Sequence, residues 1–303
     1  MIRNISFYIL LAFAMWLPAS MWGQAYSTDL YNEENGLPDR FVYTVTQDAK
    51  GFLWVGTGSG LYRFDGQDFV LFSAEDEGGP ANNFTTFSLQ DSKKRTWFGH
   101  YEGSLTLLEG MEFRSILKAG TFNSNITGIQ EDNKGRIWLS SQRNGLVRLG
   151  ESFEINQFEQ LFSEIVIVSF AITQDNLLLI GTDEGLKIYT IDSEGNPKFS
   201  HDAAQIPSTK IKCIQKRPHH KSYWLGTEDE GLLEYIPGKT PSGDTIIQFS
   251  PKQGYQIENI QSIYEDELEN VWVGTFGKGV LKYNDVDVSN RMRYMSPVAN
   301  ADS

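Results

Sequence analysis

The chain has 303 residues, of which 40% are hydrophobic, and its formal net charge at neutral pH is −13. This length and apolar content allow a sizeable core. The acidic surface disfavours binding to nucleic-acid phosphates and to anionic lipid headgroups, whereas neutral ligands such as glycans are compatible with it. We therefore expect no nucleic-acid partner.

The N-terminal segment predicts export. Arg3 supplies a positive charge, and residues 5–17 form an apolar stretch whose length suits the core of a signal peptide, with a plausible cleavage point after Gly23. A membrane-spanning helix needs about 20 apolar residues, which is more than this stretch contains. We therefore favour a cleaved signal peptide, and an uncleaved anchor is the alternative. We predict a signal peptide at 1–23, a folded domain at 24–303 and a periplasmic or otherwise exported protein.

A short sequence pattern recurs after this segment and determines the expected fold. Its first copy has the turn Asp48-Ala-Lys-Gly51, the strand Trp54-Val-Gly56-Thr57 and the start of another strand at Gly60-Leu61. One large apolar position marks each of six copies: Trp54, Trp97, Trp138, Leu179, Trp224 and Trp272. A period of about 40–50 residues with four strands per repeat is typical of propeller blades. The sequence therefore predicts an all-β protein, a β-propeller of four-stranded blades with six blades visible.

The recurring residues have structural explanations. A tryptophan in the second strand of each repeat is expected to fill the space between neighbouring blades. The Asp-x-x-Gly turn, as at Asp48 and Asp132, uses the aspartate to bond its own backbone and the glycine to supply a positive φ. Because the turn recurs, we interpret it as structural and not as a metal or catalytic site.

The rest of the chain offers little for catalysis or metal binding. Cys213 is the single cysteine and lies between isoleucines, so we expect a buried core residue and no internal disulfide. His219 and His220 are adjacent in a turn and lack metal-ligand spacing. We predict no cofactor, no metal site and no catalytic residue.

The number of outer strands does not match the number of repeats. Six inner triplets are accompanied by seven candidate outer strands: 26–31, 69–72, 113–117, 154–158, 197–200, 246–249 and 292–295. One explanation is an incomplete seven-bladed propeller, whose last inner triplet is missing. The alternative is a six-bladed ring in which 292–295 is displaced as a tail.

Several runs resemble the repeats of the two-component regulator propeller family. They are Leu30-Tyr31-Asn-Glu-Glu-Asn-Gly36-Leu37-Pro38, Gly51-Phe52-Leu53-Trp54-Val55-Gly56-Thr57 and Gly60-Leu61-Tyr62-Arg63-Phe64-Asp65-Gly66. The resemblance covers residues 26 to about 295 and implies the periplasmic sensor region of a hybrid two-component histidine kinase. It further implies an oligosaccharide ligand, a histidine kinase domain downstream or as a partner, and a full-length form anchored in the inner membrane. This chain itself has no glycine-rich phosphate loop and no other kinase motif.

Ligand-binding residues are expected in the loops between the second and third strands, because these loops differ from repeat to repeat and gather at one mouth of a propeller channel. Aromatic residues there can stack on a sugar, and the polar ones can bond hydroxyl groups; Arg143 with Lys278 can alternatively hold a uronate. The candidates are His100, Tyr101, Glu102, Gln142, Arg143, Asn144, Asp183, Glu184, Glu228, Asp229, Phe276 and Lys278.

Three functions are compatible with this sequence. The leading prediction is a ligand-binding sensor propeller of a two-component system, recognising an oligosaccharide and signalling through a kinase outside this chain. One alternative is a protein-interaction propeller without a small ligand. The other is an exported polysaccharide lyase or glycosidase, for which the paired acids at Glu228 and Asp229 would supply carboxylates. For any of these functions, a homodimer is an expected assembly.

Overall fold

The computed structural model describes residues 31–150, 152–155, 157–203, 205–255, 257–283 and the backbone of 294–297. Within these residues lie 24 β-strands and four 3-10 helices: η1 (Glu33–Asn35), η2 (Tyr101–Gly103), η3 (Pro241–Gly243) and η4 (Pro251–Gln253). No helix in the described part of the chain is long and apolar enough to cross a membrane. The predicted signal peptide lies outside the described residues.

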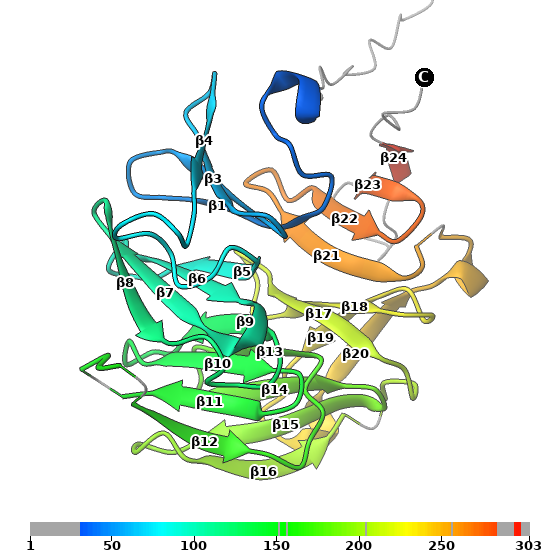
Figure 1. Ribbon diagram of the computed structural model, residues 1–303. Coiled ribbons are helices and arrows are strands. Elements are labelled where there is room, and N and C mark those ends of the chain that lie inside the picture. The colour runs from blue at the N-terminus through cyan, green and yellow to red at the C-terminus, as the bar shows by residue number, and fades with distance from the viewer. Residues whose placement is uncertain are drawn as a thin grey trace, which may run out of the picture. The chain divides into compact units, whose positions relative to one another are not determined.

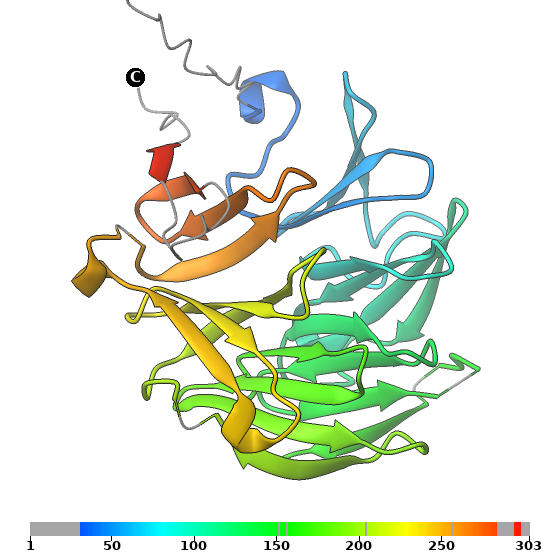
Figure 2. The same cartoon turned by 180° about the vertical axis from the view of Figure 1, so that it is seen from behind.

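The strands form six antiparallel four-stranded sheets that follow one another along the chain, and each is one blade of a propeller (Figure 1 and Figure 2). Blade 1 contains β1 (Val42–Gln47), β2 (Leu53–Thr57), β3 (Leu61–Phe64) and β4 (Phe69–Phe72). Blade 2 contains β5 (Thr85–Gln90), β6 (Thr96–His100), β7 (Leu105–Glu109) and β8 (Glu112–Leu117). Blade 3 contains β9 (Ile126–Glu131), β10 (Ile137–Ser141), β11 (Gly145–Leu149) and β12 (Phe158–Phe162).

The second half of the ring repeats the arrangement. Blade 4 contains β13 (Ser169–Ile172), β14 (Leu177–Thr182), β15 (Gly185–Ile191) and β16 (Pro197–Asp202). Blade 5 contains β17 (Ile211–Lys216), β18 (Tyr223–Thr227), β19 (Leu232–Ile236) and β20 (Thr245–Phe249). Blade 6 contains β21 (Ile260–Glu265), β22 (Val271–Thr275), β23 (Gly279–Tyr283) and β24 (Tyr294–Pro297). The predicted all-β propeller with six four-stranded blades is confirmed.

The Asp-x-x-Gly turn holds the tryptophan of its own repeat. The carboxylate of Asp132 accepts a hydrogen bond from Trp138 Nε1 at 2.9 Å and two more from the backbone nitrogens of Lys134 and Arg136. The same bond from the indole recurs in blades 1, 2 and 6, with Asp48, Asp91 and Asp266 as acceptors. These carboxylates are therefore engaged in the blades themselves, in agreement with the structural interpretation.

In blade 5 the tryptophan is held by residues from two blades. It has Arg217 in place of the aspartate, and Trp224 Nε1 donates to Glu265 of blade 6 at 2.6 Å. The Arg217 guanidinium lies between Glu265 and Glu234, at 3.0 and 2.8 Å, and all three side chains are buried. A buried cation needs such partners to offset its desolvation, so this network ties blade 5 to blade 6.

The outer strands agree with the sequence in part. The prediction of a strand at 154–158 was wrong, because the chain turns there: Phe153 N donates to Gly150 O and Gln157 N to Glu154 O. The strand begins instead at Phe158, opposite Leu149. The second half of the candidate at 292–295 lies in β24, which pairs with β23. Its first two residues, and all but the last residue of the candidate at 26–31, lie outside the described residues.

Neighbouring inner strands pack together at five junctions: β1 with β5, β5 with β9, β9 with β13, β13 with β17 and β17 with β21. Trp54, for example, packs on Phe98 of the next blade, and Trp224 packs among residues of blade 6. None of the buried apolar clusters in the described part of the chain joins blade 6 to blade 1.

Candidate functional site

The loops between the second and third strands are fixed to the start of the inner strand of the same blade. Tyr101 N donates to Phe84 O at 2.9 Å in blade 2, and Phe276 N donates to Asn259 O at 2.9 Å in blade 6. Each acceptor directly precedes an inner strand. The repeat therefore holds these variable loops at one end of the inner strands, the position expected for a ligand site.

One pocket of about 500 Å³ opens between the loops of blades 2 and 3. Its walls come from η2 in blade 2, from the β10–β11 loop in blade 3 and from the segment that connects these blades. The lining residues are Tyr101, Glu102, Gly120, Phe122, Asn123, Ser124, Asn125, Gln142 and Arg143. Four of the predicted ligand-binding residues, Tyr101, Glu102, Gln142 and Arg143, thus share one cavity.

Aromatic packing gives this pocket a rigid wall. The Tyr101 ring stacks on Phe84 with centroids 5.3 Å apart and an interplanar angle of 10°, and 44% of the tyrosine is exposed. Phe122 is buried and packs edge-on against Phe158. Because Tyr101 is supported from behind and remains partly exposed, it offers a ring on which a flat apolar surface, such as the face of a sugar, can stack.

Hydrogen bonds order the polar part of the pocket. The hydroxyls of Ser124 and Ser141 lie 2.6 Å apart, and Arg143 N donates to Ser124 Oγ at 3.1 Å. Gly120 N donates to Glu102 O at 3.1 Å, which joins the connecting segment to η2. The side chains of Glu102, Gln142 and Arg143 are exposed. The pocket therefore combines an acceptor carboxylate, an amide and a guanidinium, a set that suits polyhydroxylated ligands.

His100 lies behind the pocket and not in it. The residue is fully buried, and its ring nitrogens contact Thr85 Oγ1 at 3.2 Å and Thr106 Oγ1 at 2.8 Å. Burial lowers the pKa of His100 to about 3, so the imidazole is neutral at physiological pH. Its observed contacts hold blade 2 together beneath η2.

The remaining predicted residues do not line this pocket. Asn144 accepts hydrogen bonds from Ser141 and Ser124 behind it. The other six lie on blades 4, 5 and 6: Asp183, Glu184, Glu228, Asp229, Phe276 and Lys278. Several have partners of their own, since Lys210 pairs with Asp183 at 3.2 Å, Lys278 pairs with Glu258 at 3.4 Å and Thr209 donates to Asp229.

The segment that connects blades 2 and 3 was not among the predicted ligand-binding residues. The pocket is also lined by Phe122, Asn123, Ser124 and Asn125. These residues precede an inner strand and lie outside the loops between second and third strands. The sequence feature that indicates this part of the pocket is a polar Asn-Ser-Asn run directly after a phenylalanine, because short polar residues favour ordered turns.

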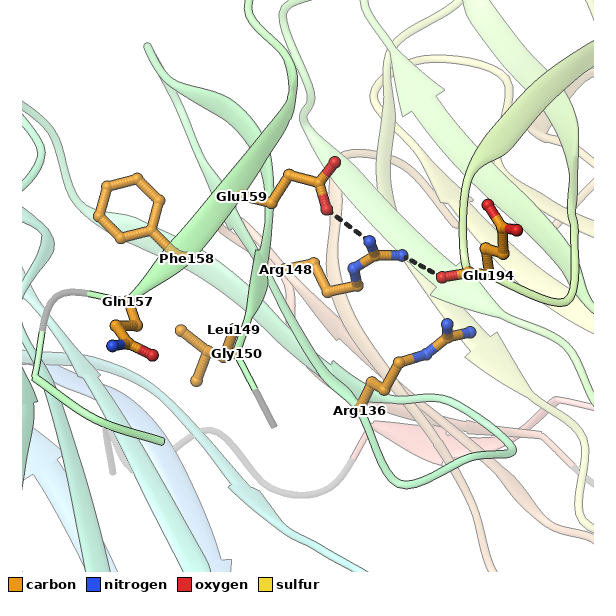
Figure 3. A pocket seen from close by; sticks show the side chains of 8 residues that line it. All are labelled: Arg136, Arg148, Leu149, Gly150, Gln157, Phe158, Glu159 and Glu194. Atoms are coloured by element: carbon orange, nitrogen blue, oxygen red, sulfur yellow. Dashed lines mark hydrogen bonds and ion pairs between the residues drawn. The ribbon is translucent and has the colours of Figure 1, made fainter. Parts of the chain in front are cut away.

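A second cavity, of about 310 Å³, lies at the rim between blades 3 and 4 and is dominated by two arginines (Figure 3). Arg148 donates to Glu159 and, at 3.1 Å, to the backbone oxygen of Glu194. Arg136 Nε binds Asp132 at 2.6 Å. Because acidic groups already pair with both guanidinium groups, we assign this cavity to the contact between blades.

The described residues contain no group of three or more His, Cys, Asp or Glu side chains arranged to hold a metal ion. Cys213 lies on β17 beneath Gly226, and burial raises the pKa of its thiol to about 12. The thiol is therefore a poor nucleophile in the folded protein.

Comparisons with known proteins agree with this fold. The sequence model described as "Two component regulator propeller" matches residues 36–59, 120–143 and 254–277. The chain is 24% identical over 294 residues to Histidine kinase P4 of Formosa agariphila, covering 87% of this chain and 21% of the kinase. Three segments of this chain thus match the repeat model, as the resemblance implied, and the chain spans about a fifth of the length of this curated relative.

Solved structures show the same architecture. The extracellular domain of a putative hybrid two-component system from B. thetaiotaomicron superposes with a TM-score of 0.68 at 18% identity, over 90% of this chain and 38% of that chain. A virginiamycin B lyase from Staphylococcus aureus gives a TM-score of 0.63 at 15% identity, over 88% and 86% of the two chains. At these identities the likeness shows a common fold.

Proposed function

We propose that this chain, which carries two-component regulator propeller repeats, is the ligand-binding sensor propeller of an exported two-component receptor, and that the pocket between blades 2 and 3 binds an oligosaccharide. The observation that carries the proposal is the meeting of a supported, partly exposed Tyr101 with Glu102, Gln142 and Arg143 in one cavity of about 500 Å³. Few other ligands match one aromatic platform surrounded by hydrogen-bonding groups as well as a sugar does.

In this mechanism the sugar ring stacks on Tyr101 while its hydroxyls bond Glu102, Gln142 and the ordered Asn-Ser-Asn segment. Arg143 lies on the opposite loop, so it can donate to a hydroxyl or pair with the carboxylate of a uronate. A ligand that touches both loops links blade 2 to blade 3. Binding therefore stabilises their relative position, and that stabilisation is the signal available to a partner domain.

The comparisons support the signalling part of the proposal. The relative named a histidine kinase and the extracellular domain of a hybrid two-component system both extend well beyond the region that this chain matches. The kinase partner, the export and the membrane anchoring of the full-length receptor are parts of the same proposal. The likeness to the virginiamycin B lyase concerns the fold alone. We therefore favour a protein that binds an oligosaccharide without cleaving it.

The test is a calorimetric titration of the purified protein with a panel of neutral and uronate-containing oligosaccharides. For a sugar that binds, Tyr101→Ala and Arg143→Ala are each expected to raise the Kd by about tenfold or more, a loss of about 1.4 kcal/mol. Phe199→Ala serves as the aromatic control, because Phe199 is 57% exposed on β16 and remote from the pocket lining.

Other outcomes assign the chain to a different class. Unchanged affinity in both pocket variants would remove the ligand from this cavity. Failure to bind any sugar, with a protein partner retained in a pull-down, would favour the interaction propeller. Shortened or unsaturated sugars after incubation would make the chain an enzyme.

A further inference from the structure

A serine, a histidine and an aspartate form a hydrogen-bonded chain at the outer rim between blades 4 and 5. Ser200 and His201 belong to β16, the edge strand of blade 4, and Asp244 lies between η3 and β20 in blade 5 (Figure 1). Ser200 Oγ lies 2.9 Å from His201 Nδ1, and His201 Nε2 lies 2.8 Å from Asp244 Oδ2. The three residue types therefore meet in the order that nucleophilic catalysis by a serine requires.

The aspartate determines how protons are arranged along this chain. An ionised carboxylate only accepts hydrogen bonds, so His201 Nε2 carries the hydrogen that Asp244 accepts. In the neutral imidazole Nδ1 is then the acceptor, and the Ser200 hydroxyl donates to it. His201 is thus placed to take the proton of Ser200, which is the role of a general base.

A β-bulge produces the contact between the serine and the histidine. Consecutive residues of a regular strand project to opposite faces, so Ser200 and His201 would point apart in an unbroken strand. Phe199 and His201 pair with consecutive residues of β15, and the register shifts between them. Ser200 is therefore the extra residue of β16. Bulges redirect side chains in this way and are frequent beside active sites.

The rest of blade 5 fixes the aspartate, whereas the serine is accessible. Tyr235 donates to Asp244 Oδ2 at 2.9 Å, and Gly238 N donates to Oδ1 at 2.8 Å. Burial and the Asp244 carboxylate raise the pKa of Tyr235, so its hydroxyl remains a donor. Asp244 is buried, His201 is partly buried and Ser200 is exposed. A substrate can thus reach the nucleophile while the aspartate is held in place.

A cavity of about 300 Å³ adjoins the imidazole. Its lining includes His201, Asp244 and the apolar residues Ala203, Pro241 and Ile246. Because the chain is strongly acidic and carboxylates border the cavity, a neutral and partly apolar molecule fits better than an anion. The cavity is therefore suited to the acyl part of a small neutral ester.

We propose that Ser200 is the nucleophile of a second site, which transfers acyl groups from small neutral esters to water, with His201 as the general base and Asp244 as the residue that positions it. Ser200 Oγ bonds to the acyl carbon while its proton passes to His201 Nδ1. That proton joins the alcohol oxygen as the bond between this oxygen and the acyl carbon breaks. Water then attacks the acyl-serine in the same way and releases a carboxylic acid and the free serine. The overall reaction is the hydrolysis of an ester, and its only co-reactant is water.

The test treats the purified protein with a biotinylated fluorophosphonate, which labels serines that a neighbouring base activates, and mass spectrometry locates the adduct. The serine oxygen displaces fluoride from phosphorus, so this covalent readout does not depend on turnover. Ser200 is expected to carry the label in the folded protein and to lose it in urea. Hydrolysis of p-nitrophenyl acetate, followed by the release of p-nitrophenol, measures the acyl transfer itself.

Three variants separate the roles of these residues. Ser200→Ala changes an exposed position and should abolish the labelling without affecting the melting temperature. His201→Gln should lower the rates of labelling and hydrolysis by about 100-fold or more, because a general base contributes at least that factor. Ser242→Ala is the matched control and should leave both rates unchanged, since Ser242 lines the same cavity and contacts the hydroxyl of Thr240 at 3.2 Å.

The proposal is overturned if Ser200 carries no label in the folded wild type, or if labelling and hydrolysis continue at the same rate in His201→Gln. Label on Ser242 in place of Ser200 would overturn it as well. Tyr101→Ala should change neither rate, because Tyr101 lines the separate pocket between blades 2 and 3. The outcome at the rim therefore does not depend on whether that pocket binds a sugar.

Discussion

The junction between blades 5 and 6 and the opposite face of blade 6, which carries Ser262, Gly274 and Val280, are made from the same repeat but differ in burial. On blade 5, Trp224 and Leu232 are buried against blade 6, and Cys213 lies beneath Gly226. On blade 6 the equivalent Trp272 is only half buried, and Ser262 takes the place of Cys213 in an exposed position. A blade therefore gains most of its burial from its neighbours, as in other repeat proteins whose stability depends on adjacent units.

The largest expected effect is a loss of stability when a tryptophan at a junction between blades is removed. Trp138 is fully buried between blades, so Trp138→Ala should lower the free energy of unfolding by about 3–5 kcal/mol. Trp272→Ala should cost less, about 1–2 kcal/mol, because Trp272 is only partly buried. Urea unfolding of the two variants measures both values, and equal losses would contradict the comparison.

A smaller effect is expected at the repeat glycines. Gly226→Ala places a methyl group against Ile260 and should cost up to about 3 kcal/mol through overpacking. Among the described residues a methyl group at Gly274 would approach the hydroxyl of Ser262, at 2.5 Å, so Gly274→Ala should cost no more than about 0.5 kcal/mol. A loss at Gly274 that matches the loss at Gly226 would mean that another segment of the chain packs against Gly274.

Because His100 is buried, the free energy of unfolding is expected to depend on pH. Its pKa of about 3 in the folded state lies below the usual 6.5, so the unfolded chain binds the extra proton first. Stability is therefore lost as the pH falls below about 6.5, by about 2 kcal/mol at pH 5, and the loss ends near pH 3. Urea unfolding at pH 7 and pH 5 should show this loss in the wild type and a smaller one in His100→Gln.

The sequence predicted the features that arise within one repeat. The tryptophan positions, the Asp-x-x-Gly turns and most strand bounds depend on residues close together in the chain, and these were confirmed. Contacts between repeats were harder to predict. The ion pairs of Arg217 with Glu265 join different blades, and Phe122 reaches the pocket from a connecting segment.

His100 shows why residue type alone misleads in a loop. A histidine next to Tyr101 and Glu102 suggested a ligand contact, but it is the last residue of β6, and its side chain points between Thr85 and Thr106. Side chains alternate between the two faces up to the last residue of a strand, and a single sequence does not show where the strand ends. The pocket itself needs three segments to meet, which the spacing of the repeats did not specify.

The most direct test compares two thiols at equivalent positions. Cys213 in the wild type faces the junction with blade 6, and Ser262→Cys in a Cys213→Ser background places a thiol at the equivalent, exposed position of blade 6. At pH 8.5 iodoacetamide should modify the thiol at position 262 at the rate of a free cysteine and Cys213 at least about 100-fold more slowly, because burial raises the pKa of Cys213 to about 12. Equal protection of the two thiols would show that position 262 is as buried as Cys213 and would contradict the account.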